Sequence, residues 1–325
     1  MTQSARLALP AVRQKWLGVP VNEIIGIVPK IAEKIPRFTR IPFALGNNGH
    51  PAKSNPYLDM IVQEPLNGNG TRVPVGVVSK SYTLLQHETV FDRSIKAIQA
   101  AGVELNQIRV YLKLTESGER MELQFFFPDE FSVTPSDGER VALRLQCINS
   151  VDGSHVFDAR LGWFRFICSN GLVIGTEKGR FKKAHTEHLD ITRIEEFLQQ
   201  GIAGATADRA RLKRWEDTKI REEALRKWVD DSLRAAWGVK AAARAYHIAL
   251  RGCDVELTQP FEKALPSQRI VRGGAKVPGA EFDNLNAYGV SQALSWLAKE
   301  RHELHEHLAR ERQISPLIQR LIALN

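Results

Sequence analysis

The stretch between Cys147 and Gly175 gathers the residue types from which active sites and metal sites are built, including two cysteines, one histidine and two arginines. Alternation of apolar residues predicts strands on both sides of its first turn, and Cys147 and Cys168 lie within them. A thiol buried among apolar side chains stays protonated and inert. The Asp-Gly and Asn-Gly dipeptides predict turns. We therefore interpret both cysteines as packing groups and predict no catalytic residue here.

Histidines elsewhere raise the question of a metal site. The segment 302–307 reads His-Glu-Leu-His-Glu-His, and a helix would place two of its histidines and a glutamate on one face. His185, His188 and Asp190 form a second candidate cluster. Neither follows the H-E-x-x-H spacing, and the sequence has no C-x-x-C pair. An alternating polar helix surface explains the first segment equally well, so we predict no metal and no cofactor.

The motifs of the common enzyme classes are missing from the sequence. It has neither the G-x-S-x-G nucleophile elbow nor a Walker A loop. The short run Arg272-Gly-Gly-Ala-Lys276 could contact phosphate through its backbone amides and its lysine. Nothing in the sequence positively supports an enzyme.

An aromatic and basic strand offers a different chemistry, the binding of nucleic acid. In a strand, Trp163 and Arg165 share one face, and an aromatic plane beside a guanidinium is how sequence-tolerant single-strand grooves hold bases and phosphates. Alternatively, Trp163 belongs to the core and Arg165 extends outward to solvent. The predicted nucleic-acid-binding residues are Arg160, Trp163, Arg165, Lys178, Arg180, Lys182, Lys183, Arg272 and Lys276.

The overall charge favours the same class of partner. The 325 residues include 45 Lys and Arg against 37 Asp and Glu, a net charge of +8, and the isoelectric point is about 9.4. This balance favours a polyanion such as nucleic acid. The segments 234–251 and 263–276 are basic and contain no acid. Three cysteines argue against a disulfide framework. The absence of a signal-peptide core and of a long apolar run predicts a cytoplasmic protein without a membrane partner.

The elements that carry these residues fall into three regions. Prolines recur through residues 1–72 and predict an extended arm. Residues 73–190 predict a strand and a helix followed by an antiparallel β-meander, which is an α+β pattern. Residues 191–325 predict a mainly α-helical C-terminal half with a long basic loop at 252–285.

Several short motifs, taken together, resemble a known family. They are Val78-Ser-x-x-Tyr82 with Gln86 and Phe91, Asn149-Ser-x-Asp-Gly-Ser154, Arg165-Phe-Ile-Cys-Ser-Asn-Gly-Leu172, His185-Thr186, and Asn286-Ala-Tyr-Gly-Val-Ser-Gln-Ala-Leu294. Over roughly residues 75–325 the chain resembles the phage- and plasmid-encoded family called domain of unknown function 932. The motif residues that carry the resemblance are Tyr82, Gln86, Asn149, Asp152, Gly153, Cys168, Asn170 and His185.

The resemblance implies a protein of a mobile element, which favours DNA processing or evasion of host defence. The strand–helix–meander order is also similar to that of single-strand annealing proteins, a fold analogy. We therefore expect a homo-oligomeric protein that binds and anneals single-stranded DNA, and whose affinity falls with salt. Two alternatives stay open: an interaction protein that blocks a host defence enzyme, and a metal-dependent nuclease.

Overall fold

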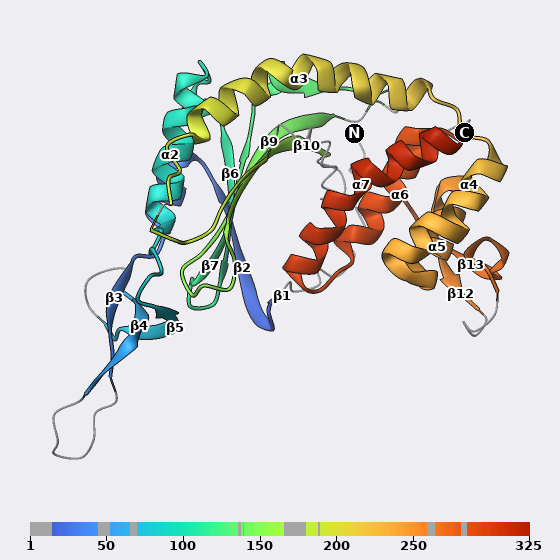
Figure 1. Cartoon of the computed structure of the whole chain (residues 1–325). Helices are drawn as coiled ribbons and strands as arrows, with labels where there is room; N and C mark the ends of the chain where they lie inside the picture. Colours follow the sequence, from blue (N-terminus) through green and yellow to red (C-terminus); the bar gives the residue numbers. More distant parts are fainter. Residues whose placement is uncertain are drawn as a thin grey trace, which may run out of the picture.

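The computed structural model describes residues 15–44, 53–65, 70–135, 138, 140–165, 180–187, 189–258, 264–280 and 285–325. The side chains of residues 164, 165, 180 and 205–209 are not included. The described chain forms a large antiparallel sheet, a smaller sheet that projects from it, and a helical lobe (Figure 1). This confirms the predicted α+β class with its meander and its mainly helical C-terminal half.

The main sheet has eight strands in the order β1-β2-β6-β7-β9-β10-β11, with β8 paired to β9. All of its described pairings are antiparallel. The strands are β1 (Lys15–Trp16), β2 (Val19–Gly26), β6 (Arg109–Thr115), β7 (Arg120–Phe126), β8 (Ser132–Val133), β9 (Val141–Ser150), β10 (Phe157–Arg165) and β11 (Arg180–Lys183). Short turns join several neighbours; at Gly118 and Gly153 the backbone has positive φ, which glycine adopts readily.

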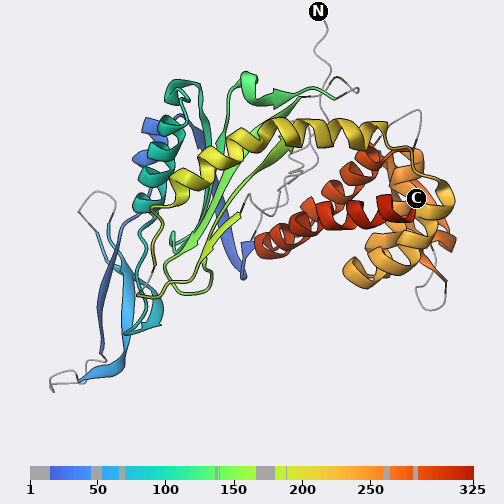
Figure 2. The ribbon, with the colours of Figure 1, turned by 45° about the horizontal axis from the view of Figure 1, so that its top comes forward.

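The described part of the predicted N-terminal arm is not an irregular extended segment. It contributes β1 and β2 to the main sheet, a short helix α1 (Val28–Ala32), and β3 (Phe38–Ala44) and β4 (Ser54–Gln63) of the smaller sheet. With β5 (Val73–Ser79) these two strands form a three-stranded sheet in the order β3-β4-β5, which projects from the body of the molecule (Figure 2). The prolines fit because Pro29 lies in the first turn of α1 and Pro42 lies on an edge strand.

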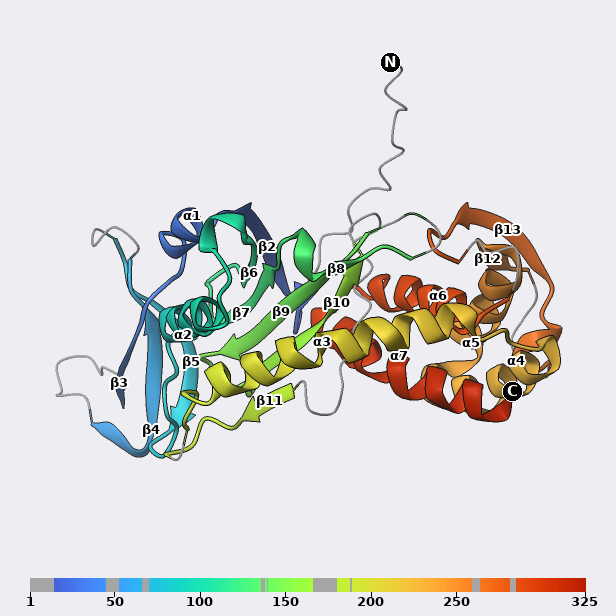
Figure 3. The same ribbon diagram turned by 90° about the horizontal axis from the view of Figure 1, so that it is seen from above.

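Two helices cover one face of the main sheet. These are α2 (His87–Ala100) and α3 (Ile194–Asp217), and α3 extends beyond the sheet to the helical lobe (Figure 3). A short 3₁₀ turn η1 (Leu105–Gln107) lies between α2 and β6, and a second one, η2 (Asp129–Phe131), lies between β7 and β8. None of the described helices is long and apolar enough to cross a membrane.

The helical lobe contains α4 (Glu222–Trp228), a π-helical turn η4 (Val229–Leu233), α5 (Arg234–Arg251), η5 (Pro266–Gln268), α6 (Ala287–Lys299) and α7 (Leu304–Leu324). It also contains a β-hairpin of β12 (Cys253–Leu257) and β13 (Val271–Lys276). The predicted loop at 252–285 is therefore wrong over these two strands. Its glycines gave the loop signal, yet a Cβ at Gly274 would lie 2.7 Å from the Asp254 carbonyl oxygen, so the strand pairing itself requires glycine there.

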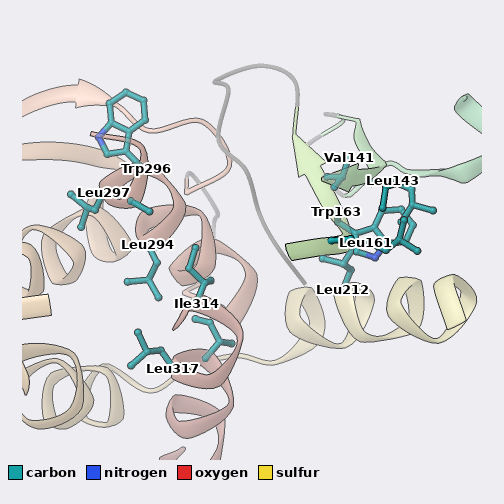
Figure 4. Close-up of a cluster of buried hydrophobic side chains, with 14 of the residues drawn as sticks. Val141, Leu143, Leu161, Trp163, Leu212, Leu294, Trp296, Leu297, Ile314 and Leu317 are labelled. Carbon is teal, nitrogen blue, oxygen red and sulfur yellow. The ribbon is translucent and has the colours of Figure 1, made fainter. Parts of the chain in front are cut away.

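One continuous cluster of buried apolar side chains joins these parts. It runs from the covered face of the main sheet, through Leu212 and Trp215 of α3, to Trp228 and the helices of the lobe. Figure 4 shows its members on both sides, with Leu161 and Trp163 on the sheet and Leu294 on α6. The sheet and the lobe thus share a core.

Candidate functional site

Strand β10 divides the main sheet into an apolar face and a polar face. Phe157, Ala159, Leu161 and Trp163 belong to the apolar face beneath α2 and α3, and each is at most 5% exposed. Trp163 is 0% exposed and contributes to the cluster drawn in Figure 4. The predicted exposed aromatic plane at Trp163 is therefore wrong, and its alternative, a core position, is correct. Helix α3 covers this face, and nothing in the local pattern of β10 indicates that cover.

On the other face of β10, Arg160 is also buried. Its exposed fraction is 4%, and Asp158 beside it is 0% exposed. The Arg160 guanidinium pairs with the Asp158 carboxylate, and Arg312 of α7 donates a hydrogen bond of 3.1 Å to the same carboxylate. The predicted exposure of Arg160 to a polyanion is thus contradicted, because an acid two residues away and α7 enclose it.

The polar face extends from Arg160 across β9 and β7. The side-chain amides of Gln124 and Gln146 both donate to one oxygen of Glu122. Arg144 donates a 3.2 Å hydrogen bond to Gln124 and lies 3.8 Å from a carboxylate oxygen of Glu311 on α7. A buried network of charged and amide groups therefore lies between the sheet and α7.

Glu311 is the central acid of this contact and is 1% exposed. Its carboxylate lies 3.1 Å from Nε2 of His307. Burial raises the pKa of Glu311, but the hydrogen bond and charge of His307 and the charges of Arg144 and Arg160 outweigh burial, so the pKa lies below its usual value. Glu311 is thus an anion held on a face rich in cations.

The motif residues that the structure describes, namely Tyr82, Gln86, Asn149, Asp152, Gly153 and His185, lie together at a joint between the two sheets. The rings of Tyr82 and His185 stack with centroids 5.0 Å apart and an interplanar angle of 6°. Tyr82 donates to the Ser150 carbonyl at 3.0 Å, and Nδ1 of His185 lies 3.1 Å from the Thr83 carbonyl. Gly153 turns beneath the Tyr82 ring with a φ of +78°. These contacts join β5, β9 and the segment after β11.

The same joint fixes the start of α2. The Gln86 amide bonds to both the N–H and the C=O of Phe38 on β3. Asn149 donates to Nδ1 of His87 at 3.0 Å, so the ring proton of His87 lies on Nε2, which donates to the Gly118 carbonyl at 2.9 Å. Each of these side chains bonds to a group of the chain itself, which is the arrangement of a structural joint.

Asp152 completes the joint at the β9–β10 turn. Its carboxylate lies 2.8 Å from a guanidinium nitrogen of Arg120, and Arg120 also donates to the Trp16 carbonyl at 2.7 Å. Gly76 of β5 packs so closely on Asp152 that a Cβ there would lie 2.7 Å from the Asp152 Cα. The three-stranded sheet β3-β4-β5 therefore packs directly on the β9–β10 turn.

The ionisation states at the joint do not suit acid–base catalysis near neutral pH. Burial lowers the pKa of His87 to about 4 and lowers that of His185. Burial likewise raises the pKa of the Tyr82 hydroxyl. Cys147 lies 3.4 Å from Ser94, and burial raises its thiol pKa to about 12. The Cys147 thiol is protonated, as predicted for a packing group.

Several predicted residues lie at the edge of the main sheet or outside the described part. Lys182 on β11 is exposed, and Lys183 is half-buried with Nζ 5.7 Å from the Phe181 ring centroid. Arg165 and Arg180 are placed on β10 and β11, but only by their backbone. The predictions at Cys168, Asn170 and Lys178 fall outside the described residues.

The β12–β13 hairpin holds the two remaining predicted residues. Arg272 and Lys276 lie at the two ends of an exposed run whose middle is Gly273, Gly274 and Ala275. Glu256 is the direct cross-strand partner of Arg272. The hairpin thus presents two cations separated by small residues whose backbone is accessible.

A cleft of about 680 Å³ lies at the ends of β6 and β7 and is lined by acids as well as by Arg109 and Arg140. A second cleft of about 560 Å³ lies between α5 and the hairpin; Lys240, Glu256, Gly274 and Ala275 are among its lining residues. Lys240 is exposed, as is Arg251 at the end of α5. Neither was among the predicted site residues, although the acid-free segment 234–251 was the signal for them.

The histidine clusters do not form a metal site in the part of the chain that is described. No group of three His, Cys, Asp or Glu side chains suited to a metal occurs there. His302 precedes α7 and does not share a helical face with His305, and His307 lies beside Glu311. His185 stacks on Tyr82, and His188 falls outside the described residues.

Comparison with known proteins gives one match. The sequence model of the family described as Domain of unknown function (DUF932) matches residues 74–275, more than half of the chain. The match includes the described motif residues of the joint and the hairpin as far as Ala275, and it ends before the late motif at 286–294. No curated protein and no solved structure matches the chain.

Proposed function

The chain belongs to the DUF932 family, and from that premise we propose that it binds single-stranded nucleic acid through the basic hairpin of its helical lobe. The observation that carries the proposal is the exposed run 272–276, in which Arg272 and Lys276 flank an accessible Gly-Gly-Ala backbone. Lysine and arginine attract phosphates, and backbone N–H groups without a side chain in front of them can donate to phosphate oxygens. Annealing of complementary strands and assembly into a homo-oligomer belong to the same proposal.

The neighbouring cations extend this surface. Lys240 and Arg251 are exposed on α5 beside the hairpin, and neither has an ion-pair partner among the described residues. By contrast, Arg244 of the same helix is paired with both Asp254 and Glu300. Four exposed cations therefore lie on this surface: Lys240, Arg251, Arg272 and Lys276.

The residues that line the second cleft determine which contacts the surface can make with a nucleic acid. The second cleft is lined by no aromatic side chain among the described residues. Base stacking, worth about 1–3 kcal/mol per base where it occurs, is then absent, and the affinity depends on phosphate contacts. We expect little preference for base sequence and a steep dependence on salt.

Fluorescence anisotropy with a labelled oligothymidylate tests the proposal. Four phosphate contacts correspond to a slope of roughly −3 in log K against log salt, at about −0.7 per contact for single strands. The double variant Arg272→Gln/Lys276→Gln should bind more weakly and lose roughly 1.4 units of that slope. Lys30→Gln/Lys34→Gln is the matched control, because it removes the same charge from exposed positions near α1, at the far end of the molecule (Figure 3).

Three results would contradict the proposal. One is the absence of binding to the oligothymidylate at low salt. Another is equal weakening by the hairpin variant and the α1 variant, which would mean that only net charge matters. The third is tighter binding to a duplex of the same length than to the single strand. An annealing assay with complementary labelled strands, and native mass measurement with and without the oligonucleotide, test strand pairing and oligomer formation.

A further inference from the structure

The contact between α7 and the main sheet changes character along the helix. In its first turns, Leu304 and Leu308 pack with Val21 and Ile148 of the sheet and with Trp16. One turn further on, the described contacts are ionic: Glu311 faces Arg144, and Arg312 bonds to Asp158. This small apolar cluster and these buried charges hold the helix on the polar face. Buried ion pairs offset much of their attraction by desolvation, so such a contact adds little net stability.

The strand register places hydrogen-bonding groups in a row across the polar face beneath this contact. Gln146 is the direct partner of Gln124 on one side and of Arg160 on the other. Arg160 in turn pairs in register with Arg180 of β11. The row therefore runs perpendicular to the strands, with its cations toward the β11 edge.

Two groups of this row lack a partner among the described residues. They are Nη1 of Arg160 and the side-chain oxygen of Gln146, on residues that are 4% and 1% exposed. Buried polar atoms are nearly always hydrogen-bonded, so an unused donor and an unused acceptor on two residues that are cross-strand partners indicate a place where a further polar group can bind. The donor is a guanidinium N–H, which suits an anionic oxygen.

We propose that the polar face of the main sheet is a second phosphate-binding surface, which α7 covers, and on which the Glu311 carboxylate takes the place of a phosphate. The ligand is the backbone of a single-stranded nucleic acid, so this inference rests on the proposed function. It adds a second site to the hairpin and a mechanism that controls access to it.

The charges on the face support this assignment. With α7 in place, Glu311 faces Arg144 and Arg312 bonds to Asp158, so the helix adds one anion and one cation to the face. Without α7, the cations Lys113, Arg144 and Arg160 remain against Glu122 and Asp158, and the exposed Lys182 lies opposite Asp158 on β11. Displacement of the helix thus leaves the net charge of these groups unchanged, but it removes the anion that faces Arg144 and uncovers three cations against two acids.

Access is then a two-state equilibrium. Nucleic acid binds this face only when α7 is displaced, so the apparent dissociation constant is the intrinsic one divided by the populated open fraction. A change that weakens the α7 contact raises that fraction and tightens binding. A change elsewhere on α7 does not.

A pair of variants on α7 tests this. Glu311→Gln keeps the shape of the side chain but removes the charge that faces Arg144 and His307. Glu306→Gln is the matched control: it makes the same charge change on the same helix, at an exposed residue that pairs with Arg301 at 3.5 Å. With labelled oligothymidylate, we expect Glu311→Gln to bind about tenfold more tightly than wild type and Glu306→Gln to bind less than twofold more tightly. Equal effects of the two variants would overturn the inference.

Hydrogen–deuterium exchange of the wild-type protein gives a test that needs no variant. Saturating oligothymidylate should increase amide exchange over residues 304–314 of α7 and decrease it over β11. Unchanged or slower exchange in α7 would overturn the inference even if the oligonucleotide binds.

The two proposals fail in different ways. If wild type binds, the hairpin variant is weaker and Glu311→Gln behaves as Glu306→Gln, only the covered face is refuted. If only Glu311→Gln binds, the hairpin is refuted and the covered face is supported. If no variant binds, both are refuted.

Discussion

Two tryptophans of the shared core differ in one atomic detail that stability measurements can detect. Trp163 and Trp228 are both 0% exposed. Nε1 of Trp228 donates a 3.0 Å hydrogen bond to the Leu317 carbonyl of α7, whereas Nε1 of Trp163 has no acceptor among the described residues. We expect Trp228→Phe to destabilise the protein more than Trp163→Phe.

The magnitude follows from the hydrogen bonds. Both variants lose similar apolar volume, which costs roughly 1–3 kcal/mol in a packed core. Trp228→Phe also loses a buried hydrogen bond worth about 1 kcal/mol, while Trp163→Phe removes an unsatisfied N–H whose burial costs about 1–3 kcal/mol. The free energies of unfolding should therefore differ by about 2–4 kcal/mol, with Trp163→Phe the more stable variant.

Urea unfolding followed by far-ultraviolet circular dichroism measures this difference, because helix content reports on the whole chain and not on single tryptophans. The two variants should keep the m value of wild type, so that the midpoint shift reports stability. Equal destabilisation, or the reverse order, would refute the reasoning about Nε1. The same samples test function: Trp163→Phe should bind oligothymidylate as wild type does, whereas a base-stacking residue would lose about 1–3 kcal/mol of binding when truncated to alanine.

Three further outcomes are expected at the joint. Gly76→Ala should destabilise by at least about 2 kcal/mol, because its Cβ would overlap the Asp152 backbone, whereas Gly273→Ala, with open space around it, should change little; both are measured by urea unfolding. Tyr82→Phe should cost about 1 kcal/mol through the lost bond to Ser150, again as a shift of the urea midpoint. His87 has a folded pKa of about 4 against an ordinary 6.5, so the unfolded state takes up its proton first. Stability should therefore fall by roughly 2–3 kcal/mol as pH drops from 6.5 to 4, and His87→Gln should flatten that dependence in urea midpoints measured across this range.

The meander and the first helices could be predicted from the sequence because their signals are local. Alternation in β6, β7 and β9, and Gly102 just after α2, are properties of neighbouring residues. The hairpin was not predicted because Gly273 and Gly274 indicate a loop when read alone. The place of Gly274 in β13 depends on its close approach to Asp254 of β12, which is a tertiary property.

The site was harder to predict than the fold, because neutralisation of a charge is also a tertiary property. The segment 234–251 contains no acid, yet its Arg244 is paired by Asp254 and Glu300 from other elements. Arg160 looked like a surface cation, but it is buried beside Asp158 on a face covered by α7. A count of basic residues along the chain therefore overstates the charge available to a polyanion.

Cations that are not paired in this way are the ones available to a polyanion. On α5, Lys240 and Arg251 keep their charges exposed while Arg244 does not. On the polar face, the Glu311 carboxylate lies 3.8 Å from the Arg144 guanidinium. If phosphates and Glu311 compete for that face, salt has two opposite effects on binding. It screens the attraction between the protein and the nucleic acid, and it also weakens the partly exposed ion pairs, such as Arg312 with Asp158, that hold α7 in place. The slope of log K against log salt should therefore be steeper for Glu311→Gln than for wild type. In the variant the α7 contact is already weakened, so salt loosens it less and offsets less of the lost attraction for the nucleic acid. A slope equal to that of Glu306→Gln would mean that the polar face takes no phosphate.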